Sequence, residues 1–174
     1  MNERRCIKVL TTGGTFEKTY LEREGELKNQ GSRIQRYILP KLRLPCVDVQ
    51  VIEVLAIDSL LMDDSHRKLV SEAIAKESAD GWPLLVVHGT DTMDQTMVYC
   101  EREHLQFSVP VVFTGAMKPV GFEDSDAIQN FTEALYATQI LQPGLYLSFH
   151  GNLFEGSAIR KNRELGTFEK VQRQ

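Results

Sequence analysis

Two short turns carry the side chains that could do chemistry together. Residues 11–15 read Thr-Thr-Gly-Gly-Thr and residues 88–93 read His-Gly-Thr-Asp-Thr-Met, and each turn directly follows an apolar run. In an open α/β sheet, ligands bind in the crevice outside the carboxyl ends of the strands. Two such turns can bring threonine hydroxyls, a carboxylate and free backbone N–H groups into one pocket. This combination suits attack of a hydroxyl on a carbonyl carbon.

Thr15 is the candidate nucleophile, because the two glycines before it let the backbone bend sharply and approach a ligand. A hydroxyl needs a base or a strongly polarising environment to attack. Taken alone, the turn is also compatible with Thr15 only capping the segment that follows.

Thr90 and Asp91 follow the apolar run 84–87, so we expect Asp91 to be partly desolvated. A buried carboxylate must be paired or hydrogen-bonded. Lys161 is the natural partner, because it follows the apolar pair Ala158-Ile159 and can reach inwards. A lysine beside a carboxylate and a hydroxyl can hold charge or relay protons. Taken alone, a lysine at this position is more often a solvated surface residue.

The elements that must position these turns alternate between strands and helices. Five apolar runs predict strands at residues 6–12, 47–55, 84–87, 109–114 and 145–149. Three of them are nearly unbroken, which is typical of parallel strands covered on both faces, whereas 47–51 alternates and predicts a partly exposed strand. Helical patterns at 32–38, 95–104 and 125–141, and one capped by Ser65, fill the gaps. The pattern predicts an α/β fold with a mainly parallel sheet. The charged stretch 16–31 and residues 115–125 are predicted to be long loops, the first of them a lid or poorly ordered.

The size and composition of the chain limit the classes of function that it can have. The chain has 174 residues, 42% hydrophobic and 25% charged, which predicts one soluble domain spanning residues 1–174. The net charge of −4 and the lack of a long apolar run argue against a nucleic-acid or membrane partner, and we expect a cytoplasmic protein. Three cysteines (6, 46 and 100) predict reduced, packed thiols, and the four histidines (66, 88, 104 and 150) show no metal-ligand spacing. His88 is expected to support its turn.

The chain resembles the bacterial-type L-asparaginase/glutaminase family. The two turns look like its two signature segments, and the similarity continues at Ser59, at residues 112–119 (VFTGAMKP), at residues 125–127 (SDA) and at Lys161. Order and spacing agree over nearly the whole chain. The resemblance implies a three-layer α/β/α domain like the N-terminal catalytic domain of that family, which acts without metal or organic cofactor.

The resemblance also implies roles. Thr15 would attack the side-chain amide of L-asparagine to form an acyl-enzyme, which water then hydrolyses to aspartate. Thr90, Asp91 and Lys161 would form the second catalytic cluster. Ser59 and Asp91 would bind the α-carboxylate and α-amino groups, and the backbone groups of Thr90 and Ala116 are plausible oxyanion donors.

The chain departs from the family pattern in three ways. Longer members carry a C-terminal domain that we expect this chain to lack, and we expect a homodimer or larger homo-oligomer to supply the missing wall. Leu60 follows Ser59 where the family often has a glutamine, which predicts weaker substrate binding. Tyr20 is the nearby candidate for the family's activating tyrosine, although plain loop packing is the alternative.

Other functions stay open at this stage. A glutaminase or another small-amide hydrolase would use the same residues. A non-catalytic amino-acid sensor would keep the pocket without turnover. An amidotransferase that feeds ammonia to glutamyl-tRNA is disfavoured, because we expect neither an extra domain nor a basic face for RNA.

Overall fold

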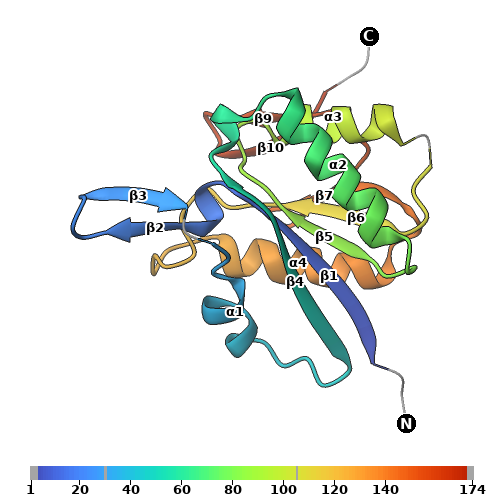
Figure 1. The fold of residues 1–174 in the computed structure, drawn as a ribbon, viewed down its shortest axis with the longest axis horizontal. Coiled ribbons are helices and arrows are strands. Elements are labelled where there is room, and N and C mark those ends of the chain that lie inside the picture. Colours follow the sequence, from blue (N-terminus) through green and yellow to red (C-terminus); the bar gives the residue numbers. More distant parts are fainter. Residues whose placement is uncertain (1–3, 30, 105, 172–174) are drawn as a thin grey trace.

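The computed structural model describes residues 4–29, 31–104 and 106–171. Its centre is a six-stranded sheet in the order β4-β1-β5-β6-β7-β8, in which four of the five strand pairings are parallel (Figure 1). The strands are β1 (Arg5–Gly13), β4 (Val47–Ile57), β5 (Leu84–Val87), β6 (Pro110–Thr114), β7 (Gly144–Phe149) and β8 (Asn152–Glu155). The predicted mainly parallel α/β fold is confirmed.

Helices cover both faces of the sheet, because its central strands are apolar on both sides. One core lies under α2 (Asp64–Ser78) and α3 (Met93–Glu103) and includes Leu10, Val86 and Phe113. The other core lies under α1 (Ile34–Tyr37) and α4 (Ala127–Ile140) and includes Val9 and Val87. The two cores define the three layers. On edge strand β4 the exposure largely alternates, as predicted.

The strand order reverses between β1 and β5. The chain leaves β1 through α1 to reach β4 on one side, and leaves β5 through α3 to reach β6 on the other. Loops that diverge from neighbouring strands in this way open a crevice at a topological switch point. The register pairs Thr11 with Val87, so the two threonine-bearing turns leave the sheet side by side. The fold therefore places them together.

One crossover has the unusual hand. The β5–α3–β6 and β6–α4–β7 connections run in the same direction across the sheet, but α3 and α4 pack on opposite faces. These two connections therefore have opposite hands, and parallel crossovers are right-handed in about 98% of cases. The β6–α4–β7 connection is the exception, because the other three parallel crossovers share one hand. It contains the loop that carries Ala116.

Several local predictions are corrected. Residues 16–31 do not form one long loop: a 3-10 turn (Thr15–Glu17) leads into a hairpin of β2 (Lys18–Leu21) and β3 (Glu26–Asn29), which projects from the sheet (Figure 1). A second hairpin, β9 (Ile159–Asn162) with β10 (Thr167–Lys170), and strand β8 were not predicted. Two further 3-10 turns span Leu39–Lys41 and Ser59–Leu61. Cys46 is exposed rather than packed. No described helix is long and apolar enough to cross a membrane.

The start of α2 also differs from the prediction that Ser65 is its cap. The carboxylate of Asp63 accepts the backbone N–H groups of Ser65 (2.9 Å) and His66 (3.2 Å), and the Ser65 hydroxyl donates to it as well. The cap is Asp63, because its side chain satisfies two N–H groups that have no partner within the helix.

We therefore expect Asp63→Ala to lower the free energy of unfolding by about 1 kcal/mol, the usual cost of losing a cap. Ser65→Ala is the matched control and should cost only a few tenths, because both backbone bonds remain. Urea denaturation of the two variants measures the difference. Equal losses would show that Asp63 is not the cap.

Candidate active site

The two turns meet through their glycines. A Cβ atom built on Gly14 would lie 2.4 Å from the Cα atom of Gly89, and one built on Gly89 would lie 3.3 Å from the Cα atom of Gly14. Only glycine permits this approach, and Gly14 also has a positive φ of 77°. Since Thr15 and Thr90 each follow one of these glycines, the backbone contact holds the two threonines at one site. Thr15 is partly exposed there.

Ser59 lies against the same contact. A Cβ atom on Gly89 would be 2.5 Å from the Ser59 Oγ atom, and the Thr92 hydroxyl donates to the Ser59 carbonyl at 2.8 Å. Ser59 is 1% exposed, whereas its neighbours Leu60 and Leu61 are 64% and 70% exposed. The structure therefore places the predicted substrate-binding serine against the second turn, at Gly89, while the neighbouring Leu60 is exposed to solvent.

Lys161 joins the site from β9. Its Nζ atom donates to Thr90 Oγ1 at 2.7 Å and to Asp91 Oδ1 at 3.0 Å. The side chains of Lys161 and Asp91 are 15% and 20% exposed, so this ion pair is largely shielded from solvent. The predicted pairing of Asp91 with Lys161 is confirmed. The ammonium occupies one lone pair of the Thr90 hydroxyl, which itself donates to Met117 Sδ at 3.8 Å. Because a thioether is a weak acceptor, the hydroxyl can turn its proton towards a ligand.

A second cation, Arg163, was missed by the sequence reasoning. Its Nη1 atom donates to Asp91 Oδ1 at 3.0 Å, and its side chain is 68% exposed. Spacing offered a signal: Lys161 and Arg163 are two residues apart at a strand end, where side chains two residues apart lie on one face.

The loop that carries Ala116 is held by Asp126. This carboxylate accepts the N–H groups of Met117 and Lys118, each at 3.0 Å, and contacts His150 Nε2 at 2.8 Å. Burial alone would raise the pKa of Asp126, but these hydrogen bonds outweigh it and lower the pKa. A Cβ atom on the preceding Gly115 would lie 3.3 Å from the Thr90 Cγ2 atom. Ala116 is therefore brought close to Thr90.

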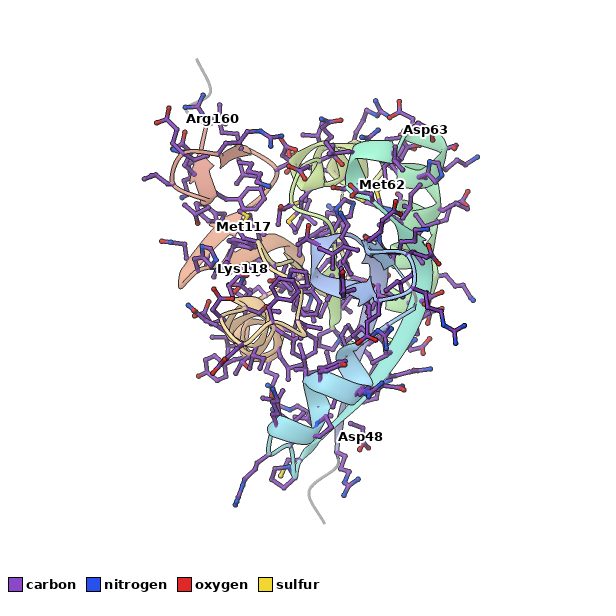
Figure 2. All side chains as sticks on the ribbon, turned by 90° about the vertical axis from the view of Figure 1, so that its left-hand side faces the viewer. Asp48, Met62, Asp63, Met117, Lys118 and Arg160 are labelled. Atoms are coloured by element: carbon purple, nitrogen blue, oxygen red, sulfur yellow. The ribbon has the colours of Figure 1, made fainter. Side chains whose placement is uncertain are left out.

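Figure 2 looks at the molecule from the left-hand side of Figure 1, the side from which the β2–β3 hairpin projects. Met117 and Lys118 lie below the hairpin that carries Arg160, and Met62 and Asp63, just beyond Ser59, lie across from them. The labelled residues that neighbour Ala116, Ser59 and Lys161 in the sequence thus lie together in the upper half of this view.

His88 supports its turn, as predicted. It is fully buried, and burial lowers its pKa to about 4, so the ring is neutral. Nδ1 lies 2.7 Å from the Gly89 carbonyl and must donate to it, which leaves Nε2 to accept the Thr96 hydroxyl at 2.9 Å. The ring fixes the backbone next to Thr90.

Glu17 lies buried beneath the first turn. Its Oε2 atom accepts the Gly13 N–H at 3.2 Å, the side chain is 2% exposed, and Oε1 has no hydrogen-bond partner among the described residues. Burial raises the pKa of Glu17 to about 7. The sequence reasoning missed this residue because it treated 16–31 as a charged loop.

Tyr20 is not brought to this cluster. It is 56% exposed on β2 and lines a groove of about 240 Å³ with Arg33, Tyr37 and Phe122, a groove that none of the cluster residues lines. The base of its hairpin is instead tied to the site by Lys18, whose Nζ lies 2.6 Å from Asp58 Oδ2, next to Ser59. The catalytic role of Tyr20 stays a prediction.

No group of three or more histidine, cysteine or acidic side chains in the described ranges is placed to hold a metal ion. Each of the four histidines contacts a protein partner: His66 contacts Asp63, His88 contacts Gly89 and Thr96, His104 contacts Ser71, and His150 contacts Asp126.

Comparison with known proteins agrees with this geometry. The family model described as "Asparaginase, N-terminal" matches residues 6–173. An L-asparaginase of Thermococcus kodakarensis is 29% identical over 92% of this chain and 48% of its own length. One component of the glutamyl-tRNA(Gln) amidotransferase of Methanococcus vannielii is 29% identical over 89% of this chain and 38% of its own. The solved thermostable L-asparaginase from Thermococcus kodakarensis superposes with a TM-score of 0.85 at 26% identity, over 97% of this chain and 52% of that one.

The fold and the site define a three-layer α/β domain in which two threonine-bearing turns meet at the topological switch point. The chain belongs to the asparaginase family, to which its N-terminal domain model assigns it. It spans about half the length of the L-asparaginase it matches.

Replacing Gly14 tests the backbone contact. Gly14→Ala should destabilise the protein by several kcal/mol and disrupt the site, because the new methyl group would clash with the Gly89 backbone. Gly25→Ala is the matched control: its φ is also positive, at 67°, but nothing lies within 4 Å, so it should cost roughly 1–2 kcal/mol. Thermal unfolding compares the two variants. Equal losses would refute the close approach.

Glu17 predicts a pH dependence of stability. Its pKa is near 4.5 in the unfolded chain and about 7 in the folded one, so between these values the folded state holds a proton that the unfolded state has lost. Stability therefore falls as pH rises from about 4.5 to 7, by about 3 kcal/mol, and stays lower above that range. Glu17→Gln should match the wild type near pH 4 and be more stable at pH 8. The exposed control Glu22→Gln should follow the wild type, and a Glu17→Gln profile parallel to the wild type would contradict the assignment.

Proposed function

We propose that this chain is an L-asparagine amidohydrolase that uses Thr15 as its nucleophile. The observation that carries the proposal is the Lys161–Thr90–Asp91 hydrogen-bonded cluster, set beside Thr15 by the Gly14–Gly89 contact. Family membership supports amide hydrolysis as the class of reaction, and the L-asparaginase similarity supports L-asparagine as the substrate.

In the first half-reaction, Thr15 Oγ1 forms a bond to the carbon of the side-chain amide. The tetrahedral intermediate carries a negative oxygen, for which the backbone N–H groups of Thr90 and Ala116 are the proposed donors. Collapse of this intermediate breaks the C–N bond, and the amide nitrogen leaves as ammonia after taking up the proton given up by Thr15. Among the described residues, none hydrogen-bonds to the Thr15 hydroxyl, so this proton needs a carrier. Tyr20 is the proposed carrier, and this role requires the projecting β2–β3 hairpin to bring the Tyr20 hydroxyl to Thr15.

In the second half-reaction, water attacks the ester. The Thr90 hydroxyl, which accepts a hydrogen bond from Lys161, is proposed to orient that water. The bond to Thr15 Oγ1 then breaks, which releases L-aspartate and restores the threonine hydroxyl. Asp91 Oδ2 makes no hydrogen bond to another described residue, so it is available to accept the α-ammonium group, and Ser59 is proposed to bind the α-carboxylate.

L-Glutamine is the competing substrate, because the similarity to the amidotransferase component does not distinguish the amide of asparagine from that of glutamine. An amino-acid sensor is the alternative without turnover. Assembly as a homodimer or larger oligomer and a cytoplasmic location remain part of the proposal.

Ammonia release from L-asparagine and L-glutamine tests the function. We expect turnover of L-asparagine that falls at least about 10³-fold in Thr15→Ala, because removing a nucleophile leaves only binding and polarisation. The control Thr132→Ala, exposed on α4, should keep full activity. Binding of L-asparagine without ammonia release by the wild type would favour the sensor, and faster turnover of L-glutamine would reassign the substrate.

A further inference from the structure

Among the described residues, Arg163 is the one cation of the site that is still open to a ligand. Its Nη1 atom contacts Asp91, but its other guanidinium nitrogens make no hydrogen bond to the described part of the chain, and the side chain is 68% exposed. Lys161, by contrast, is 15% exposed and directed at Thr90 and Asp91. A guanidinium presents N–H groups in a fixed fork that matches a carboxylate.

The backbone holds Arg163 in place. The side chain of Asn162 accepts the N–H groups of Glu164 and Leu165 at 3.1 and 3.0 Å and donates to Glu169 at 2.8 Å, which orders the turn between β9 and β10. Phe168, on β10, is 3% exposed and anchors this hairpin in the core. Arg163 therefore lies on an ordered turn, which lowers the entropy cost of ordering its backbone when a ligand binds.

The local charge favours an anion. Asp91 carries one negative charge, and both Lys161 and Arg163 lie 3.0 Å from the same oxygen, Oδ1. The nearby Lys18 and Lys118 are neutralised by Asp58 and Asp124. Asp91, Lys161 and Arg163 together therefore carry one net positive charge. Arg163 is the cation of this group that is exposed to a ligand.

We infer that Arg163 binds the free carboxylate of the substrate, so that the site selects amides of amino acids over neutral amides. This inference rests on the proposed function for the identity of the amide. It assigns a binding residue that the sequence did not suggest, and it offsets the hydrogen bonds lost where Leu60 replaces a glutamine. Asp91 Oδ2 would bind the α-ammonium group and Arg163 the α-carboxylate group of the same amino acid.

Steady-state kinetics of Arg163→Gln test the assignment, with Arg160→Gln as matched control. Arg160 lies on the same hairpin and is equally exposed, but it pairs with Glu169. For L-asparagine we expect Arg163→Gln to raise KM at least about tenfold with kcat changed less than about threefold. For L-asparagine methyl ester, which lacks the carboxylate, neither variant should change kcat/KM. Arg163→Lys should fall between the wild type and Arg163→Gln for L-asparagine.

The comparison of substrates separates binding from positioning. If Arg163 only holds Asp91 in place, its loss affects both substrates equally, and that result would overturn the inference while leaving the proposed function intact. If the wild type releases no ammonia, the proposed function fails, and calorimetric titration with L-aspartate decides the inference. Binding weakened at least about tenfold in Arg163→Gln but not in Arg160→Gln would support it, and no binding or equal binding would overturn it.

Discussion

The site depends on one backbone contact, the approach of Gly14 to Gly89 at the carboxyl ends of β1 and β5. These strands are neighbours and the chain leaves them in opposite directions, so their turns lie at a topological switch point, the place where ligands bind in open α/β sheets. A side chain at Gly14 would push the turns apart, and one at Gly89 would clash with Ser59. The contact therefore determines whether Thr15 and Thr90 act as two surface threonines or as one site.

Buried polar groups hold the turns once they have met. The neutral ring of His88 fixes the second turn, the carboxyl group of Glu17 lies under the first, and Asp126 holds the loop of Ala116. Each of these groups satisfies backbone N–H or C=O groups that the sheet leaves without partners. The cost of burying Glu17 shows as its raised pKa, which makes the first turn the pH-sensitive part of the support.

The sequence allowed the five parallel strands of the central sheet and most of the candidate site to be predicted, because apolar strands and glycine turns reflect burial and backbone shape directly. The pairing of Lys161 with Asp91 followed from the cost of burying a carboxylate alone. The β2–β3 hairpin did not follow, since its strands are short, polar and largely exposed and carry no strong periodicity. The cap at Asp63 was misplaced by two residues because aspartate and serine are equally good caps. Arg163 was missed because its partner depends on how the β9–β10 hairpin docks.

The most direct test of the account is intact and peptide mass spectrometry after rapid acid quenching of the enzyme with L-asparagine. A threonine nucleophile at the meeting point of the two turns predicts a transient ester that adds one aspartyl group to the peptide containing Thr15. The same adduct on the peptide containing Thr90, or ammonia release with no adduct at any time point, would contradict the account.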